Sequence, residues 1–230
     1  MRILRNSFIA LLATVSFIAA EEIPITAMGK QQNLSEMIPV DASKAYDLVL
    51  LAKGDAGTMT VTVLQFDAKK RRIGAYHVSG NADSLTQTVG PAIRGAKSFI
   101  VKDASGWMPV TNGRNILAFN AKDDHSDIPN FAIDYYVKSV TQQADGTWKI
   151  EMSDKLRNSY PDATFVRQHF DGAHMSWRFK LPMTAPHGHH IAPAELGHGN
   201  LHWWMGTAFV QVQVRVDGAT SASVIEWCLK

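Results

Sequence analysis

Apolar and polar residues alternate with a period of two along much of the chain. The alternation is strongest in Ala208–Val216, where valines at every second position are separated by Gln211, Gln213 and Arg215. Such a pattern predicts a β-strand with one face in the core and the other in water. The same template fits seven further segments: Tyr46–Ala52, Thr58–Phe66, Ser98–Val101, Phe131–Val140, Thr147–Met152, Thr164–Phe170 and Val224–Leu229.

Turn sequences rich in Gly, Asp and Asn separate these segments. Asp145-Gly146 lies between two of the predicted strands and is typical of a hairpin turn, because Gly and Asp supply the positive φ that tight turns require. Helical periodicity is nearly absent after residue 20. Many strands with frequent turns, and no alternation of strands with helices, predict an all-β fold, an antiparallel β-sandwich of jelly-roll type.

The first twenty residues predict an export signal. Arg2 and Arg5 precede an apolar run, Phe8–Ala20, that ends in small residues and is too short to span a bilayer. We therefore expect residues 1–20 to be a secretory signal peptide, residues 21–230 to form a single β-sandwich domain, and the protein to be secreted or periplasmic. The lone cysteine, Cys228, excludes an internal disulfide and is interpreted as a structural thiol.

The net charge of the chain limits the classes of partner that it is expected to bind. The chain has 23 basic and 21 acidic residues, and without Arg2 and Arg5 the two signs balance at 21 each. A neutral chain has no electrostatic footprint for nucleic acid. No segment after residue 20 is apolar enough to insert into a membrane, so we expect no membrane insertion of the mature chain. The sequence leaves the oligomeric state open.

The order of features between about Ala45 and Gly172 resembles the jelly-roll carbohydrate-binding modules of the galactose-binding-like superfamily. The stretch Tyr46–Gly54 is similar to their early core strand, and Thr58–Phe66 followed by the basic turn Lys69–Arg72 is similar to their next hairpin. Trp107, Ile116–Phe119 and Ile128–Phe131 continue the pattern over about half of the mature chain. The resemblance implies a glycan as partner, and it implies a structural calcium ion whose ligands cannot be matched residue by residue.

Tryptophans are the residues best suited to hold a neutral glycan, since sugar rings stack their C–H faces on indole. Trp148 and Trp227 alternate with apolar residues inside predicted strands and are interpreted as core. Trp203 and Trp204 are adjacent, so in a strand they point to opposite faces and one of them is a candidate for a groove. The predicted ligand-binding residues are Trp107, Trp177 and Trp203.

Export, the resemblance and these tryptophans together predict a non-catalytic carbohydrate-binding protein with exposed aromatic residues. Glutamate is scarce and no pair of carboxylates suited to glycoside hydrolysis stands out, so no catalytic residue is assigned. An exported polysaccharide lyase or glycoside hydrolase of jelly-roll fold remains the alternative, because Tyr135, Tyr136, Tyr160 and His169 offer acid and base groups. A third alternative is a surface-assembly protein.

Two segments are candidates for metal ions. Asp123, Asp124 and Asp127 form an acidic loop of the kind that calcium favours, although the EF-hand spacing is missing. The stretch Met183–Asn200, rich in His, Pro and Gly, is predicted to be a long loop. Zinc or copper would suit its possible ligands, which are His187, His189, Glu195, His198 and the nearby His202. The alternative is a solvated polar loop without metal.

Overall fold

The computed structural model describes residues 22–110 and 115–230. The predicted signal peptide, residues 1–20, lies outside these described residues. Within them the protein is all-β, with several antiparallel sheets packed on one another, which confirms the predicted all-β sandwich class. The jelly-roll connectivity stays a prediction. Helix is restricted to two single turns, α1 (Ala75–Val78) and the 3-10 turn η1 (Ala82–Ser84).

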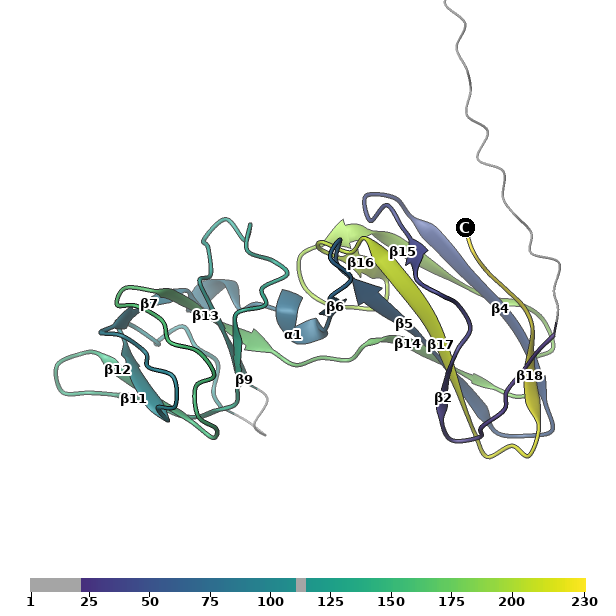
Figure 1. Ribbon diagram of the computed structural model, residues 1–230, viewed down its shortest axis with the longest axis horizontal. Coiled ribbons are helices and arrows are strands. Elements are labelled where there is room, and N and C mark those ends of the chain that lie inside the picture. The colour runs from purple at the N-terminus through teal and green to yellow at the C-terminus, as the bar shows by residue number, and fades with distance from the viewer. Residues whose placement is uncertain (1–21, 111–114) are drawn as a thin grey trace, which may run out of the picture.

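The strands gather into two bodies that lie side by side along the long axis of the molecule (Figure 1). We call residues 22–74 and 172–230 body 1, and residues 75–171 body 2. Body 2 is thus inserted into body 1. Each body has its own apolar core cluster, one centred on the valines of body 1 and one on Phe99, Phe119 and Ile150 of body 2. That residues 21–230 form a single domain stays a prediction. The strands of this range form two separate apolar cores, one in each body.

Body 1 is a sandwich of two sheets (Figure 1). One sheet has the order β1 (Ile23–Pro24), β18 (Ala222–Leu229), β4 (Tyr46–Gly54), β15 (His187–Glu195) and β16 (His202–Trp204). The other has the order β14 (Met175–Lys180), β5 (Thr58–Phe66), β17 (Phe209–Asp217) and β2 (Gln31–Asn33), with β3 (Ile38–Pro39) paired to β17 and β6 (Arg72–Ile73) paired to β5. All pairings in body 1 are antiparallel except that of β15 with β16.

The alternation that predicted β17 is the reason for its position in the sandwich. Its residues pair with β5 without interruption from Phe209–Phe66 to Asp217–Thr58. Val210, Val212, Val214 and Val216 are all buried in the core of body 1, whereas the residues between them face outward. Burying one branched apolar side chain at every second position is the main stabilisation available to such a strand.

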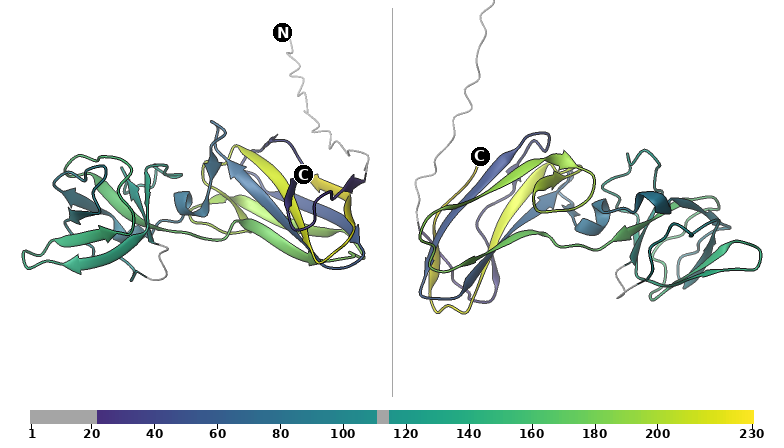
Figure 2. Two further views of the ribbon diagram at one scale, coloured as in Figure 1. Left: turned by 60° about the horizontal axis from the view of Figure 1, so that its bottom comes forward. Right: turned by 180° about the vertical axis from the view of Figure 1, so that it is seen from behind.

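Body 2 is a rolled sheet of seven strands (Figure 2). Their order is β10 (Ile133–Tyr135), β9 (Asn115–Phe119), β13 (Phe165–Phe170), β7 (Thr86–Val89), β8 (Ser98–Val101), β12 (Trp148–Met152) and β11 (Val137–Gln142). The two edge strands, β10 and β11, are joined by Tyr136 alone, so the sheet must curl to bring its edges together. Tyr136 has a φ of 57°, which breaks the single strand predicted over Phe131–Val140 into two. The predicted hairpin at Asp145-Gly146 is confirmed between β11 and β12.

The two bodies meet at a small apolar joint. We define the joint as Arg71, Ala75, Ile128, Phe131 and Trp204. The indole of Trp204, at the end of β16, packs with Ala75, Ile128 and Phe131. The Arg71 guanidinium of body 1 lies 3.8 Å from the ring centroid of Phe131 of body 2, a cation–π contact. The joint therefore combines side chains from both bodies and from the segment that connects them.

The long loop predicted over Met183–Asn200 is wrong for its middle half, His187–Glu195. His187–Glu195 forms β15, and its first half pairs with β4 from His187–Leu50 to Ile191–Tyr46. Pro193 lies near the end of the strand, where the pairing changes to the short parallel strand β16 with an irregular register. His187, His189 and His190 thus lie on a regular strand, and the residues of the predicted loop before and after β15 are outside any strand.

Candidate functional site

The three tryptophans predicted to bind a ligand do not converge. Trp177 and Trp203 belong to the core of body 1, whereas Trp107 lies in body 2. Trp203 has an exposed fraction of 0% and Trp204 one of 1%, so the expectation that one of this pair faces solvent is wrong. The physical reason is that β16 is covered on both faces. Trp203 packs edge-on against Tyr46 inside the sandwich, and Trp204 packs into the joint.

Trp177 has no flat face free for a sugar. It lies on the edge strand β14, is 9% exposed, and stacks on the imidazole of His189 with ring centroids 4.4 Å apart and planes 19° from parallel. Phe179 contacts the same imidazole and also that of His187, both at 5.4 Å. His187 and His189 therefore project to the same side of β15, as an extended chain requires, but toward aromatic rings. Burial, reinforced by nearby His187, lowers the pKa of His189 below its usual value.

The remaining histidines of this region pair separately with different side chains: His190 with Asp47 at 2.9 Å, His198 with Ser79 at 2.7 Å and His202 with Glu195 at 3.0 Å. Within residues 22–110 and 115–230, no three His, Cys, Asp or Glu side chains form a group that can hold a metal ion. The predicted zinc or copper ligands are thus spread along the sheet edge and the joint. Cys228 is a free, half-buried thiol on β18.

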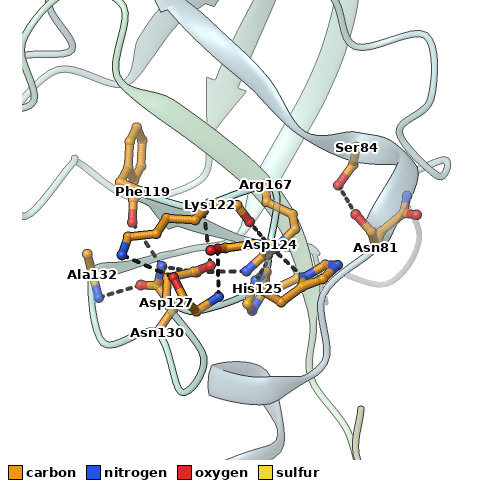
Figure 3. A network of polar contacts seen from close by, with 12 residues as sticks. Asn81, Ser84, Phe119, Lys122, Asp124, His125, Asp127, Asn130, Ala132 and Arg167 are labelled. Carbon is orange, nitrogen blue, oxygen red and sulfur yellow. Dashed lines mark hydrogen bonds and ion pairs between the residues drawn. The ribbon is translucent and has the colours of Figure 1, made fainter. Parts of the chain in front are cut away.

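The acidic loop that was a candidate for calcium has its one buried carboxylate committed to other groups. Figure 3 shows this loop beside β13. Asp127 forms an ion pair of 2.7 Å with Arg167 and accepts hydrogen bonds from the Asn130 amide and the Lys122 backbone N–H. Asp124 instead caps the backbone of Ser126 at 3.0 Å. The carboxylates of Asp127 and Asp124 are thus already paired with hydrogen-bond donors of the protein.

Trp107 lines a groove at the rim of the rolled sheet. The groove has a volume of about 420 Å³ and is lined by Ala104, Ser105, Trp107, Met108, Pro109, Val110, Lys138, Ser139, Val140 and Trp148. We call it the aromatic groove. Trp148 is half-buried and lies at the start of β12, directly after the hairpin turn. The sequence analysis placed Trp148 in the core, and its position beside Asp145-Gly146 was the signal that it stands at the rim instead.

Hydrogen bonds to buried groups fix the positions of Trp107 and Met108, which form one wall of the aromatic groove. The Gln168 side chain, which is fully buried on β13, accepts a hydrogen bond from the Met108 N–H at 2.8 Å and donates one to the Met108 carbonyl at 3.0 Å. The Trp107 indole N–H donates to the Ser84 carbonyl at 2.8 Å. Trp107 is 8% exposed, so it forms the floor of the groove, and half-buried Trp148 provides the accessible ring. A wall fixed in this way is preorganised for a ligand.

The lining of the aromatic groove is mainly apolar, with a few polar groups. None of the described residues that line it is an Asp, Glu, His or Tyr. The polar groups are two hydroxyls, from Ser105 and Ser139, and the ammonium of Lys138. The Ser105 and Ser139 hydroxyls donate to Asp103 and Glu151, so they face a ligand as acceptors, and Lys138 is the donor. Indole rings with a few polar groups suit a ligand that both stacks and forms hydrogen bonds.

Comparison with protein-family models, with curated proteins and with solved structures gave no match to this chain. The resemblance to galactose-binding-like modules therefore stays a prediction. None of the helices in the part of the chain that the structure describes is long and apolar enough to span a membrane.

Proposed function

We propose that this protein binds a carbohydrate without transforming it, and that the binding site is the aromatic groove of body 2. The observation that carries the proposal is that half-buried Trp148 and buried Trp107 line one preorganised groove, together with the Lys138 ammonium and two hydroxyl groups. The volume of the groove, about 420 Å³, lies in the range of small-ligand sites, about 300–1,000 Å³. We further propose, from the signal predicted at residues 1–20, that binding takes place outside the cytoplasm.

This proposal moves the site that the sequence predicted. Trp107 remains a member, and Trp148 takes the stacking role that was expected of Trp177 and Trp203. An enzyme of the hydrolase type would need two carboxylates across the scissile bond. The described lining of the groove offers none, so we propose a binding role.

Substitution of the accessible indole tests the proposal. Affinity electrophoresis in gels that contain individual polysaccharides should show retardation of the protein by at least one of them, with a change in tryptophan fluorescence. In Trp148→Ala we expect binding to weaken by about tenfold, because a stacked contact with an aromatic ring contributes about 0.5–1.5 kcal/mol beyond the apolar area that it buries. Circular dichroism of the variant verifies that the sheet is retained.

Trp227→Ala is the matched control. Trp227 is also half-buried on a strand, but it lies on β18 in body 1 and packs at the edge of that core. We expect this control to bind as the parent does. Equal binding by Trp148→Ala and the parent would move the site elsewhere, and retardation by no polysaccharide at all would contradict the proposed function.

A further inference from the structure

A second hollow adjoins the aromatic groove and shares Lys138 with it. This hollow has a volume of about 220 Å³ and is lined by Lys97, Ser98, Lys138, Glu151, Met152 and Ser153. We call it the lysine hollow. Both cavities lie along the hairpin of β11 and β12. Trp148 lines the aromatic groove, and Met152 lines the lysine hollow. These two residues are four positions apart, which is about 13 Å along a strand at about 3.3 Å per residue.

The carboxylate in the lysine hollow is already neutralised. Glu151 accepts hydrogen bonds from the Lys149 ammonium at 2.8 Å and from the Ser139 hydroxyl at 3.1 Å. These contacts, together with the charges of Lys149 and Lys138, hold the pKa of Glu151 below its usual value, so it is ionised and paired. The carboxylate of Glu151 therefore forms its ion pair with Lys149. The two lysines that line the hollow, Lys97 and Lys138, are not part of that ion pair.

Lys97 and Lys138 have no such partner. Both side chains are exposed, and neither forms an ion pair with any residue that the structure describes. They stand on opposite sides of the end of β12. The Met152 N–H donates to the Lys97 carbonyl at 2.8 Å, and the Ser153 N–H donates to the Tyr136 carbonyl, two residues before Lys138, at 2.9 Å.

Two strand spacings separate the backbones of these lysines, a distance of about 10 Å. Their long side chains line one hollow and can reach a single anion between them. Lys138 lies where the register of β11 shifts by one residue, between Val137 and Ser139. A shift of this kind re-aims the side chain of the extra residue, which explains how Lys138 lines both cavities.

We propose that the ligand of this groove is an acidic polysaccharide, with a sugar ring stacked on Trp148 and the carboxylate or sulfate of a neighbouring sugar held between Lys97 and Lys138. The inference rests on the proposed function and specifies its ligand class. The hydroxyls of Ser98 and Ser153 supply further donors for an anion or for sugar hydroxyls. The hydroxyls of Ser105 and Ser139 already donate to Asp103 and Glu151, so they offer lone pairs that accept from sugar hydroxyls. Charge-assisted hydrogen bonds are stronger than neutral ones, so the acidic group should dominate selectivity.

Matched pairs of polysaccharides test this inference. Polygalacturonate and its carboxyl-reduced neutral form differ only in the carboxylate, and dextran sulfate and dextran differ only in the sulfate. We expect one or both acidic polymers to bind about tenfold or more tightly than their neutral counterparts, and this preference to shrink as salt is raised. The pair that shows the preference identifies the anion.

Lysine variants then locate the site. In Lys97→Ala/Lys138→Ala we expect the preference for the acidic polymer to fall by about tenfold. Lys30→Ala/Lys69→Ala removes the same charge from exposed positions in body 1 and should retain it. Equal binding of acidic and neutral polymers would overturn the acidic ligand and leave carbohydrate binding in place. An acidic preference that survives loss of Lys97 and Lys138 would overturn the lysine hollow. Binding of no polymer would contradict the proposed function itself.

Discussion

Arg167 is a fully buried charge of body 2, with an exposed fraction of 1%, and every nitrogen of its guanidinium has a partner. Its Nε donates to His169 at 3.1 Å, its Nη1 to the Lys122 carbonyl at 3.0 Å, and its Nη2 to Asp127 at 2.7 Å (Figure 3). Burial opposes the charge on Asp127, but the hydrogen bonds and the Arg167 charge outweigh it and lower the pKa of that carboxyl. The pair fixes the acidic loop to β13.

Removing Asp127 should therefore be costly. In Asp127→Ala the guanidinium of Arg167 stays buried without its counter-charge, and we expect the free energy of unfolding to fall by about 3–5 kcal/mol. Urea unfolding followed by circular dichroism measures the change. Asp217→Ala is the control, because Asp217 pairs with Arg215 at 2.8 Å on the exposed surface, where such a pair contributes about 0–1 kcal/mol. Similar losses in the two variants would show that the Arg167 pair does not stabilise the fold.

At the scale of single residues, the sequence indicated which side chains suit a binding role, but not how deeply each of them is buried. Trp107, one of the residues predicted to bind a ligand, lines the aromatic groove. Trp148 was assigned to the core because alternation reports the face of a strand and not how close the residue lies to its rim. Asp127 was grouped with Asp123 and Asp124 by proximity in sequence. Its actual partner, Arg167, is 40 residues away, and no local pattern indicates that contact.

The turn predicted at Asp145-Gly146 is present, and comparison with the turn at Gly57 separates two kinds of turn glycine. Gly57, between β4 and β5, and Gly146, between β11 and β12, both have positive φ, 85° and 86°. A Cβ on Gly57 would collide with the backbone of Asp217 and Gly218, whereas a Cβ on Gly146 would meet open space. The turn at Gly57 is therefore packed against a second turn, and the turn at Gly146 stands free.

Alanine at these two glycines should distinguish backbone strain from packing. In Gly146→Ala only the positive φ is unfavourable, which costs about 1–2 kcal/mol. In Gly57→Ala the same strain is joined by the collision with Asp217, and we expect a total loss of about 3 kcal/mol or more. Thermal unfolding of both variants measures the difference. A Gly57→Ala protein as stable as Gly146→Ala would mean that the turn at Asp217 moves aside without cost.

Most of the strands predicted from alternation lie close to their observed bounds. β14 was not predicted, although its apolar residues Met175, Trp177 and Phe179 alternate with polar ones. β5 and β8 match their predicted ranges, and β17 begins and ends within one residue of its range. β15 was missed because Gly188, Pro193 and its histidines are typical of loops. Its pairing with β4 outweighs that local preference, which is a tertiary effect that one segment cannot reveal.

At the scale of the whole molecule, two buried histidines lie where the bodies meet. His169 accepts a hydrogen bond from Arg167 at Nε2, because arginine only donates, so its proton is at Nδ1 and is donated to the Tyr76 carbonyl. His77 accepts from the Gly74 N–H at Nδ1. Burial is the main reason that the pKa of each falls from 6.5 to about 4, with nearby positive charge adding to the effect. A second proton on either ring would oppose an existing donor.

These two histidines should make the protein acid-sensitive. In the unfolded chain they take up protons near pH 6.5, but in the folded protein only near pH 4, so the unfolded state binds more protons between these values. Stability should therefore fall as pH decreases from about 6.5 to about 4, by up to roughly 3 kcal/mol for each histidine. The melting temperature measured across this range tests the prediction. His169→Gln should show a shallower decline, and a flat profile in the parent protein would contradict the assignment.

The division into two bodies was not foreseen, because strands with a period of two look alike whichever sheet they join. Composition does not change at residue 75 or at residue 172, where the chain passes between the bodies. The first core strands of body 1, β4 and β5, find their main partners only after body 2 is complete. Which strand belongs to which body is determined by pairing between distant segments, so no local segment of the sequence indicates it.

The insertion of body 2 also orders the events of folding. All seven strands of body 2 lie within residues 86–170, so its contacts join residues that are comparatively near in sequence. Body 1 pairs β4 with β18 and β5 with β17, across about 150 residues or more. Its contact order is high, and high contact order slows folding. On the ribosome, body 2 can close its core before β17 and β18, the main partners of β5 and β4, have been synthesised.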